Sequence, residues 1–382
     1  MQSVPKRLLR GGAIAALALA MTVPTAVLAD PQSTPNGPWL TDEQEVNLSA
    51  LLSYDQLWDS LERIEHASHG AMTLSAAPRQ SNTGRDIPVA SIGTGDAGIM
   101  IIASQHGNEY VVTNSAMELI RDLSGNSKQD RAIREAVTVT VVPRVNVDGF
   151  DAPVTDAFGR VTPWRQNYDP FCVSGPCPPF YQRGRGYDIN RYHSYLPDAD
   201  VDPYNPGQPN PVPESLAMRL LYDELQPDIV MDLHHQGSYV DDDGDLITGS
   251  TLWPNATAAA ESLGVTDQFE DAVVVSKQVV ATMATELDQY GYANLTLYPG
   301  TTTPGIARNA YGLLGAGSVL FEMRGGIGTK SNGYVAKTAY NAVKAVVVAL
   351  ADGSLADTDI AIAESLPERG SFIGAPNEES DE

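Results

Sequence analysis

Three short groups of polar residues, each at the end of an apolar run, carry side chains that bind metals or move protons. His106-Gly-Asn-Glu109 closely follows the run Ile-Met-Ile-Ile-Ala-Ser. A His and a Glu at this spacing can both bind one metal ion when they lie in a turn. Asp232-Leu-His234-His235 ends a second apolar run. Because neighbouring side chains of a strand point to opposite faces, only one of the two histidines should face the same ion. Two His and one Glu form a catalytic zinc site that leaves one coordination position for water.

The third group is Ser318-Val-Leu-Phe-Glu322-Met-Arg324, an apolar run that ends on a carboxylate. Burying a Glu in a strand is costly unless the carboxylate is paired or functional. An ion pair with Arg324 is the structural alternative here. The first two groups have ordinary alternatives as well, a surface turn for one and a buried plus an exposed histidine for the other.

The elements that must position these groups alternate along the chain. Apolar runs predict strands over 98–104, 137–145, 228–234 and 318–323, and helical spacing predicts helices over 109–123, 214–225, 272–290 and 334–350. This alternation predicts an α/β fold, a single layered domain with a mixed, mostly parallel central sheet flanked by helices. The polar groups then lie where open α/β sheets hold ligands, at the carboxyl ends of strands.

Composition excludes several classes of protein. The 382 residues include 24 Lys and Arg against 48 Asp and Glu, a formal charge of −24, so a nucleic-acid binder driven by phosphate neutralisation is not expected. Hydrophobic residues at 42% and charged residues at 19% exclude global disorder and a multi-span membrane protein.

The motifs resemble those of the zinc carboxypeptidase family, the carboxypeptidase A-like metallopeptidases. The resemblance covers roughly Leu48 to Leu350, and its motifs occur in the family's order. They are His106-x-x-Glu109, Trp164-Arg165, Asp188-Ile-Asn190-Arg191, Asp232-Leu-His234 and Phe321-Glu322-x-Arg324. The resemblance implies a carboxypeptidase-like fold and one zinc ion held by His106, Glu109 and His234.

The resemblance also implies roles for five further residues. Glu322 matches the general base that takes a proton from water and returns it to the leaving amine, and Arg165 matches the arginine that stabilises the oxyanion. Asn190 and Arg191 match the pair that binds the terminal carboxylate of a peptide substrate, and Asp188 matches the acid that orients a metal histidine, here His106.

Some positions depart from the family pattern. His235 stands where a small residue is common, so it is an alternative ligand to His234. The family's mobile tyrosine, which lies upstream of the catalytic Glu, has no clean match in this sequence. Tyr298 and Tyr311 are interpreted as core or rim tyrosines, with the mobile catalytic tyrosine as the alternative for each. Arg308 is interpreted as a surface arginine, with a preference for acidic terminal residues as the alternative.

Two loop features have ordinary interpretations. We interpret Asp241-Asp-Asp-Gly-Asp245 as a solvated turn, with attraction of basic side chains or a calcium site as alternatives, and His193 as an exposed loop residue.

Four segments make up the predicted chain. Lys6, Arg7 and Arg10 precede an apolar stretch that ends in Val-Leu-Ala, so residues 1–29 are predicted to be a secretory signal peptide, with an uncleaved anchor helix as the alternative. Residues 30–45 are predicted to be a linker, 46–351 the catalytic domain and 352–382 an acidic disordered tail. Export permits a disulfide between the only two cysteines, Cys172 and Cys177.

The sequence thus predicts a secreted or periplasmic zinc metallocarboxypeptidase, a monomer without stable membrane association after signal cleavage. It would act on peptides with a free C-terminal carboxylate. A zinc amidase acting on peptidoglycan stem peptides or other non-standard amides is the first alternative. A non-catalytic binding protein with the same fold is the second, and the presence of every metal ligand and of the base argues against it.

Overall fold

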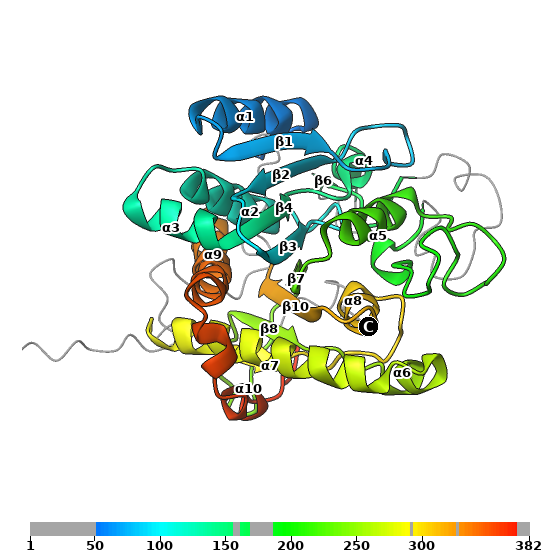
Figure 1. The fold of residues 1–382 in the computed structure, drawn as a ribbon, viewed down its shortest axis with the longest axis vertical. Coiled ribbons are helices and arrows are strands. Elements are labelled where there is room, and N and C mark those ends of the chain that lie inside the picture. The colour runs from blue at the N-terminus through cyan, green and yellow to red at the C-terminus, as the bar shows by residue number, and fades with distance from the viewer. Residues whose placement is uncertain (1–50, 156–160, 169–185, 291–292, 326–327, 373–382) are drawn as a thin grey trace, which may run out of the picture.

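An eight-stranded mixed sheet runs through the molecule, with helices on both faces (Figure 1). The structure is a computed structural model and describes residues 51–155, 161–168, 186–290, 293–325 and 328–372. The predicted signal peptide (1–29), the predicted linker (30–45) and the predicted disulfide between Cys172 and Cys177 lie outside the described residues.

The strand order is β1-β2-β4-β3-β7-β10-β8-β9. The four central strands β4, β3, β7 and β10 are parallel, whereas the β1-β2, β2-β4 and β10-β8 pairs are antiparallel. A two-stranded ribbon, β5 (Val154–Thr155) and β6 (Val161–Thr162), lies apart from this sheet. The strands of the main sheet are β1 (Met72–Ala76), β2 (Pro88–Ile92), β3 (Ala97–Ala103), β4 (Val137–Val142), β7 (Ile229–Gln236), β8 (Gly249–Leu252), β9 (Leu295–Leu297) and β10 (Gly317–Arg324).

The helices fall on the two faces of this sheet. α2, α7 and α9 cover one face, and α5 and α8 cover the other (Figure 1). The α-helices are α1 (Tyr54–Ala67), α2 (Val111–Leu123), α3 (Lys128–Ala136), α4 (Val147–Phe150), α5 (Pro213–Leu225), α6 (Thr257–Leu263), α7 (Thr266–Asp288), α8 (Ala307–Leu313), α9 (Gly328–Asp352) and α10 (Ala361–Glu364). Two short 3₁₀ helices, η3 (Ile189–Arg191) and η4 (Ser354–Asp357), complete the described elements.

Side chains of the central strands alternate between two cores. On β3, Ile99 and Ile101 pack into the core under α2, α7 and α9, whereas Met100 and Ile102 pack into the core under α5 and α8. Burial on both faces explains why the central strands read as almost continuous apolar runs. The same alternation decides which polar side chains at the strand ends share a face.

The predicted α/β architecture is confirmed, and the predicted elements differ from the observed ones mainly at their ends. The helix predicted over 272–290 begins earlier, at Thr266, and the closing helix predicted over 334–350 begins at Gly328. The strand predicted over 137–145 ends at Val142, because Pro143 follows and the chain turns toward α4.

The prediction that residues 352–382 form a disordered tail is wrong for residues 352–372. This segment contains η4 and α10, and α10 lies beside α7 (Figure 1), where Glu364 forms an ion pair with Lys277 at 2.6 Å. Leu355 and Ala363 are buried in the main core. The acidic composition of this segment gave no indication of these apolar contacts, because they join residues that are distant in the sequence. Residues 373–382 lie outside the described residues.

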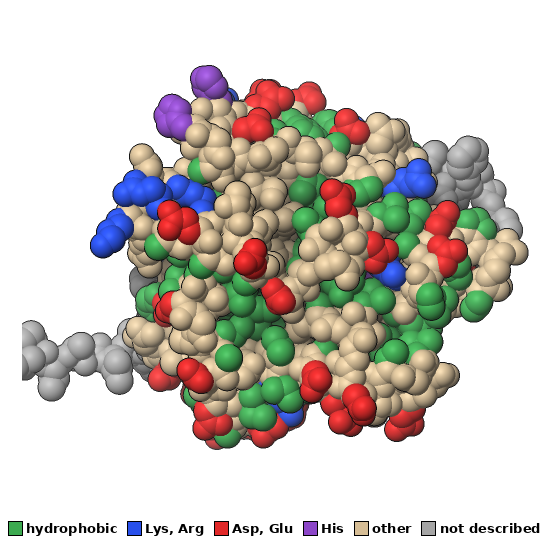
Figure 2. Space-filling model, viewed as in Figure 1, with side chains coloured by type: hydrophobic (Ala, Val, Ile, Leu, Met, Phe, Trp, Pro, Cys, Tyr) green, Lys and Arg blue, Asp and Glu red, His purple; other side chains and the backbone are tan. Residues whose placement is uncertain are grey.

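The acidic composition shows on the surface. Figure 2 shows Asp and Glu side chains spread across the visible face, with basic side chains in smaller groups. A large net negative charge favours solubility and says little about the fold. In the part of the chain that the structure describes, no helix combines the length and the hydropathy needed to cross a bilayer.

Candidate metal centre

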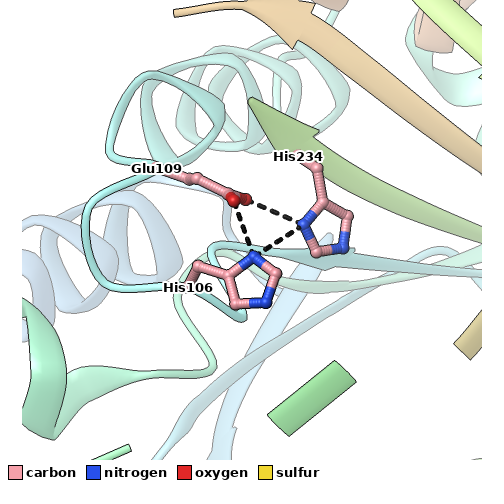
Figure 3. Close-up of side chains that lie close together, drawn as sticks. All are labelled: His106, Glu109 and His234. Carbon is pink, nitrogen blue, oxygen red and sulfur yellow. Dashed lines mark hydrogen bonds and ion pairs between the residues drawn. The ribbon is translucent and has the colours of Figure 1, made fainter. Parts of the chain in front are cut away.

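His106, Glu109 and His234 converge on one point at the carboxyl ends of β3 and β7 (Figure 3). The Nδ1 atoms of the two imidazoles face each other at 3.2 Å. One oxygen of Glu109 lies 2.6 Å from Nδ1 of His106, and the other lies 2.8 Å from Nδ1 of His234. All three side chains are buried. The structure therefore brings together the three residues predicted to bind the metal.

The turn between β3 and α2 presents His106 and Glu109. Ser104, the first residue after β3, has a positive φ of 55°, which turns the chain sharply toward the site. Gly107 follows His106 because a Cβ there would lie 2.2 Å from the carbonyl oxygen of Trp164. This close approach lets the N–H of Gly107 donate to the carbonyl oxygen of Arg165 at 3.0 Å, so the Trp164-Arg165 segment lies against the metal turn.

The two adjacent histidines point to opposite faces of β7. His234 faces Glu109, whereas Nε2 of His235 accepts the N–H of Val111 at 3.0 Å, at the first residue of α2. Burial lowers the pKa of His235 to about 4, so its ring is neutral and can accept this bond. Its ring packs edge-on against Tyr110. His235 therefore caps a helix, and the geometry favours His234 as the ligand.

The electrostatics of the cluster suit a cation. The pKa of Glu109 lies well below its usual value, because the charges of His106 and His234 outweigh the opposite effect of burial. The pKa of His234 lies well above its usual value, because Asp232 and Glu109 outweigh burial in the same way. Two imidazole nitrogens and a carboxylate oxygen are a donor set that zinc prefers. The residues present therefore fit a zinc ion.

Asp188 connects His106 to two arginines. Its Oδ1 accepts Nε2–H of His106 at 2.9 Å, which leaves Nδ1 of that ring to face the site. Its Oδ2 lies 3.2 Å from Nη1 of Arg165 and 3.8 Å from Nη1 of Arg191. The pKa of Asp188 lies well below its usual value, because Arg191, His106 and Arg165 outweigh the effect of burial. The two arginine side chains are 19% and 24% exposed, so both border the site without being enclosed.

Asn190 is buried, and its side chain bonds to other groups of the protein. It is 4% exposed, and its Oδ1 accepts the N–H of Ala307 at 2.8 Å. Its Nδ2 lies 3.2 Å from Oδ2 of Asp232 and 3.0 Å from Nε2 of His234. Binding of a substrate carboxylate by Asn190 stays a prediction. The structure adds that its amide also packs behind a metal histidine.

Glu322 lies beside His234 on the neighbouring strand. The two residues are register partners in the parallel β7-β10 pair, so their side chains point to the same face of the sheet. Glu322 is 7% exposed. Arg324, two positions further along β10, donates its Nε–H to Oγ of Ser238 at 3.0 Å. The pairing of Glu322 with Arg324 therefore stays an alternative to a role at the metal site.

Two residues interpreted as exposed are buried. Arg308 is 1% exposed, and its Nη2 donates to Oδ1 of Asn255 at 3.2 Å and to the carbonyl oxygen of Thr301 at 2.7 Å. Its interpretation as a surface arginine is wrong, because α8 packs against the sheet. His193 is 0% exposed and bonds to two buried side chains, so its interpretation as an exposed loop residue is wrong as well.

The remaining candidates separate by burial. Tyr311 is 0% exposed and its hydroxyl bonds to His193, which makes it a core tyrosine. Tyr298 is partly exposed, and the guanidinium of Arg369 stacks on its ring at 4.5 Å. Its role as the mobile catalytic tyrosine stays an alternative. In the Asp241 loop, Oδ1 of Asp241 accepts the N–H groups of Asp243 and Asp245, the geometry of an ordinary turn.

Sequence reasoning missed the residues that hold the site from behind. Nδ2 of Asn146 donates to the carbonyl oxygens of Arg165 and Gln166, both at 2.9 Å, and so fixes the arginine segment. Gln105 and Asp232 bond each other at 2.6 Å. The period-two pattern of β7 was an available signal for Asp232, since it places Asp232 on the same face as His234. Asn146 and Gln105 had no local signal.

Comparisons with known proteins agree with this geometry. The sequence profile of the family described as zinc carboxypeptidase matches residues 61–340, whereas a search of curated proteins gave no significant match. Among solved structures, the metallo-carboxypeptidase from Burkholderia cenocepacia has 17% identity and a TM-score of 0.52, covering 80% of this chain and 70% of that one. The carboxypeptidase A from Helicoverpa armigera has 16% identity and a TM-score of 0.56, covering 81% and 75%.

A third structure, bovine thrombin-activatable fibrinolysis inhibitor in complex with tick carboxypeptidase inhibitor, has 15% identity and a TM-score of 0.56, covering 80% of this chain and 97% of that one. Identities this low establish a shared fold. The family profile goes further, since it spans more than half of the chain and contains all three converging ligands. The resemblance inferred from the motifs is thereby confirmed, and the chain belongs to the zinc carboxypeptidase family.

Proposed function

We propose that this chain removes the C-terminal residue of peptides by hydrolysis, with Glu322 as the general base. Its family acts on peptides with a free C-terminal carboxylate. The observation that carries the assignment of the base is the cross-strand pairing of Glu322 with His234, which places a carboxylate next to the metal ligands on the same face of the sheet. A general base must lie within reach of the proton that it abstracts.

Each residue around the cluster has a part in this reaction. A zinc ion held by His106, Glu109 and His234 would lower the pKa of a bound water to about 7 and polarise the carbonyl of the cleaved bond. Glu322 accepts the proton of the attacking water and returns it to the leaving amine. Arg165 donates to the oxygen on which negative charge develops.

The terminal carboxylate of the substrate belongs to the residue that follows the cleaved bond. A fixed positive charge is therefore required one residue away from the point of cleavage. Arg191 suits this role, because its side chain is 24% exposed and its guanidinium can present two parallel N–H donors to a carboxylate. Asn190 precedes it on η3 and is the second predicted contact. Asp188 holds Arg191 in place from the protein side, at 3.8 Å.

Peptides that differ only at their C-terminus test the proposal. The zinc-loaded protein is incubated with a mixed library of peptides, the same peptides as C-terminal amides, and muropeptides, and released products are identified by mass spectrometry. We expect single residues to be released from the free acids, and the amides to survive because they lack the carboxylate for Arg191. Equal cleavage of the amides, or cleavage of muropeptides alone, would contradict the proposal, and the second result would support the amidase alternative.

Replacing Arg165 by Ala tests the oxyanion role. We expect kcat to fall by about 10²- to 10³-fold with a much smaller change in KM, because the missing donor acts on charge that develops only in the transition state. Steady-state kinetics on a released amino acid measures both constants. The control is Arg191→Ala, for which the main effect should be a higher KM. A higher KM with unchanged kcat in Arg165→Ala would assign this arginine to substrate binding.

We also propose that the chain is exported, on the basis of the basic start, apolar middle and small-residue end of residues 1–29. Export would also permit the predicted disulfide between the two cysteines of the sequence. N-terminal sequencing of protein recovered from outside the producing cytoplasm should give a chain that begins at Asp30. Recovery of only full-length chain in a membrane fraction would support the anchor helix instead.

A further inference from the structure

A buried series of hydrogen-bonded side chains leads from His234 to Tyr311 on α8. It consists of Asp232, Gln105, His193 and Tyr311, and we call it the Asp232 chain. Oδ1 of Asp232 lies 2.9 Å from Nε2 of His234 and 2.6 Å from Nε2 of Gln105. Oε1 of Gln105 lies 2.6 Å from Nε2 of His193, whose Nδ1 lies 3.0 Å from the Tyr311 hydroxyl.

Every member of the Asp232 chain is 0% exposed. Burying a carboxylate, an amide, an imidazole and a phenol in one place is costly unless each polar atom has a partner. These groups come from β3's end, β7, the loop after η3 and α8, so the fold assembles them from four separate segments. Neither metal binding by three ligands nor the chemistry assigned to Glu322 and Arg165 uses them.

The hydrogen bonds can run in only one direction. A carboxylate accepts, so the NH₂ group of Gln105 must face Asp232, and its carbonyl oxygen then faces His193. Nε2 of His193 must therefore carry the hydrogen. Burial lowers the pKa of His193 to about 4, so the ring is neutral and its Nδ1 accepts from Tyr311. Each donor in the chain thus meets an acceptor.

One end of the Asp232 chain contacts the predicted metal ligand His234. Because Oδ1 of Asp232 accepts from Nε2 of His234, the lone pair of Nδ1 is left to face Glu109 and Nδ1 of His106. The other metal histidine has its own carboxylate, since Asp188 bonds Nε2 of His106 at 2.9 Å. Asp232 and His234 share one face of β7, as residues two positions apart in a strand do.

We propose that Asp232 is a positioning residue for His234, and that Gln105 and His193 hold Asp232 in the orientation that gives the site its affinity for zinc. The proposal rests on the zinc site of the proposed function. It assigns to the Asp232 chain a function in metal affinity beyond its contribution to folding.

Replacing Asp232 by Asn tests the proposal, because no orientation of an amide satisfies the site. With its oxygen toward His234, the amide nitrogen faces Nδ2 of Asn190, which lies 3.2 Å from Oδ2 of Asp232. With the nitrogen toward His234, it faces two donors, the Nε2–H of His234 and the NH₂ of Gln105. Loss of such a partner typically weakens metal binding by about 10- to 100-fold.

The measurement is the zinc dissociation constant of metal-free protein, by competition with a chromogenic chelator. We expect Asp232→Asn to raise it about 10- to 100-fold, and Gln105→Met to raise it about 2- to 10-fold through loss of the hydrogen bond that holds Asp232. Glu214→Gln is the matched control, a buried carboxylate that bonds Asn82 and Asn167 and touches no metal ligand. Its dissociation constant should equal that of the unaltered protein.

Equal zinc affinity of Asp232→Asn and the unaltered protein would overturn the proposal, whatever the change in melting temperature. Failure of the unaltered protein to bind zinc would instead overturn the proposed function. A spectrum of ¹⁵N-histidine-labelled, unaltered protein at neutral pH does not depend on any variant folding. It should show His193 neutral with the hydrogen on Nε2, and a hydrogen on Nδ1 would contradict the direction of the chain.

Discussion

Replacing Glu322 by Gln is expected to lower kcat/KM by about 10²- to 10⁴-fold, the usual contribution of a general base. The amide keeps the shape of the side chain but cannot accept and return a proton. The zinc content should stay unchanged, because Glu322 does not belong to the three converging ligands. Kinetics on a free-acid peptide, together with metal analysis of the same sample, checks both statements.

The control for this variant is again Glu214→Gln, a buried carboxylate on α5 that contacts neither the ligands nor the arginines. It makes the same chemical change and should leave kcat/KM unchanged. An active Glu322→Gln protein with normal zinc content would refute the base assignment. An inactive protein that has lost its zinc would mean that Glu322 holds the metal site together.

Substitutions of the adjacent histidines His234 and His235 should give the second large effect. We expect the first to weaken zinc binding and the second to leave it unchanged. His234→Ala removes a zinc ligand. The binding free energy of a structural zinc site is roughly 10–16 kcal/mol. Shared among the ligands, it corresponds to about 3 kcal/mol or more for each ligand, or at least about 10²-fold in affinity. His235→Phe should keep zinc affinity and activity, but leave the N–H of Val111 without its acceptor, at a cost of about 1–3 kcal/mol of unfolding free energy.

Zinc competition and urea unfolding of both variants measure this contrast. The pair is matched because the two positions are neighbours on one strand and both rings are buried. If His235→Phe lost zinc and His234→Ala kept it, the assignment of faces on β7 would be inverted.

The sequence was most informative where one rule decides a position. Period-two alternation on β7 required that only one of His234 and His235 face the ion, and the structure shows the two rings on opposite faces. The central strands were predictable because burial on both faces makes them apolar throughout. The His106 turn was predictable because it directly follows such a strand.

Contacts between distant segments were not predictable in this way. His193 was interpreted as exposed because it lies in the loop after Arg191, yet it meets Gln105, 88 positions earlier, and Tyr311, 118 positions later. The segment 352–372 was interpreted as disordered from its charge, although Leu355 and Ala363 pack into the core. Arg308 was interpreted as a surface residue for a similar reason, because the burial of α8 depends on tertiary packing.

The central claim is that three side chains hold one zinc ion, and anomalous diffraction at the zinc edge from a crystal of the zinc-loaded protein tests it most directly. The account predicts a single strong peak about 2.0–2.2 Å from Nδ1 of His106, Nδ1 of His234 and a carboxylate oxygen of Glu109. A peak coordinated by His235, or the absence of any peak between these three residues, would contradict it.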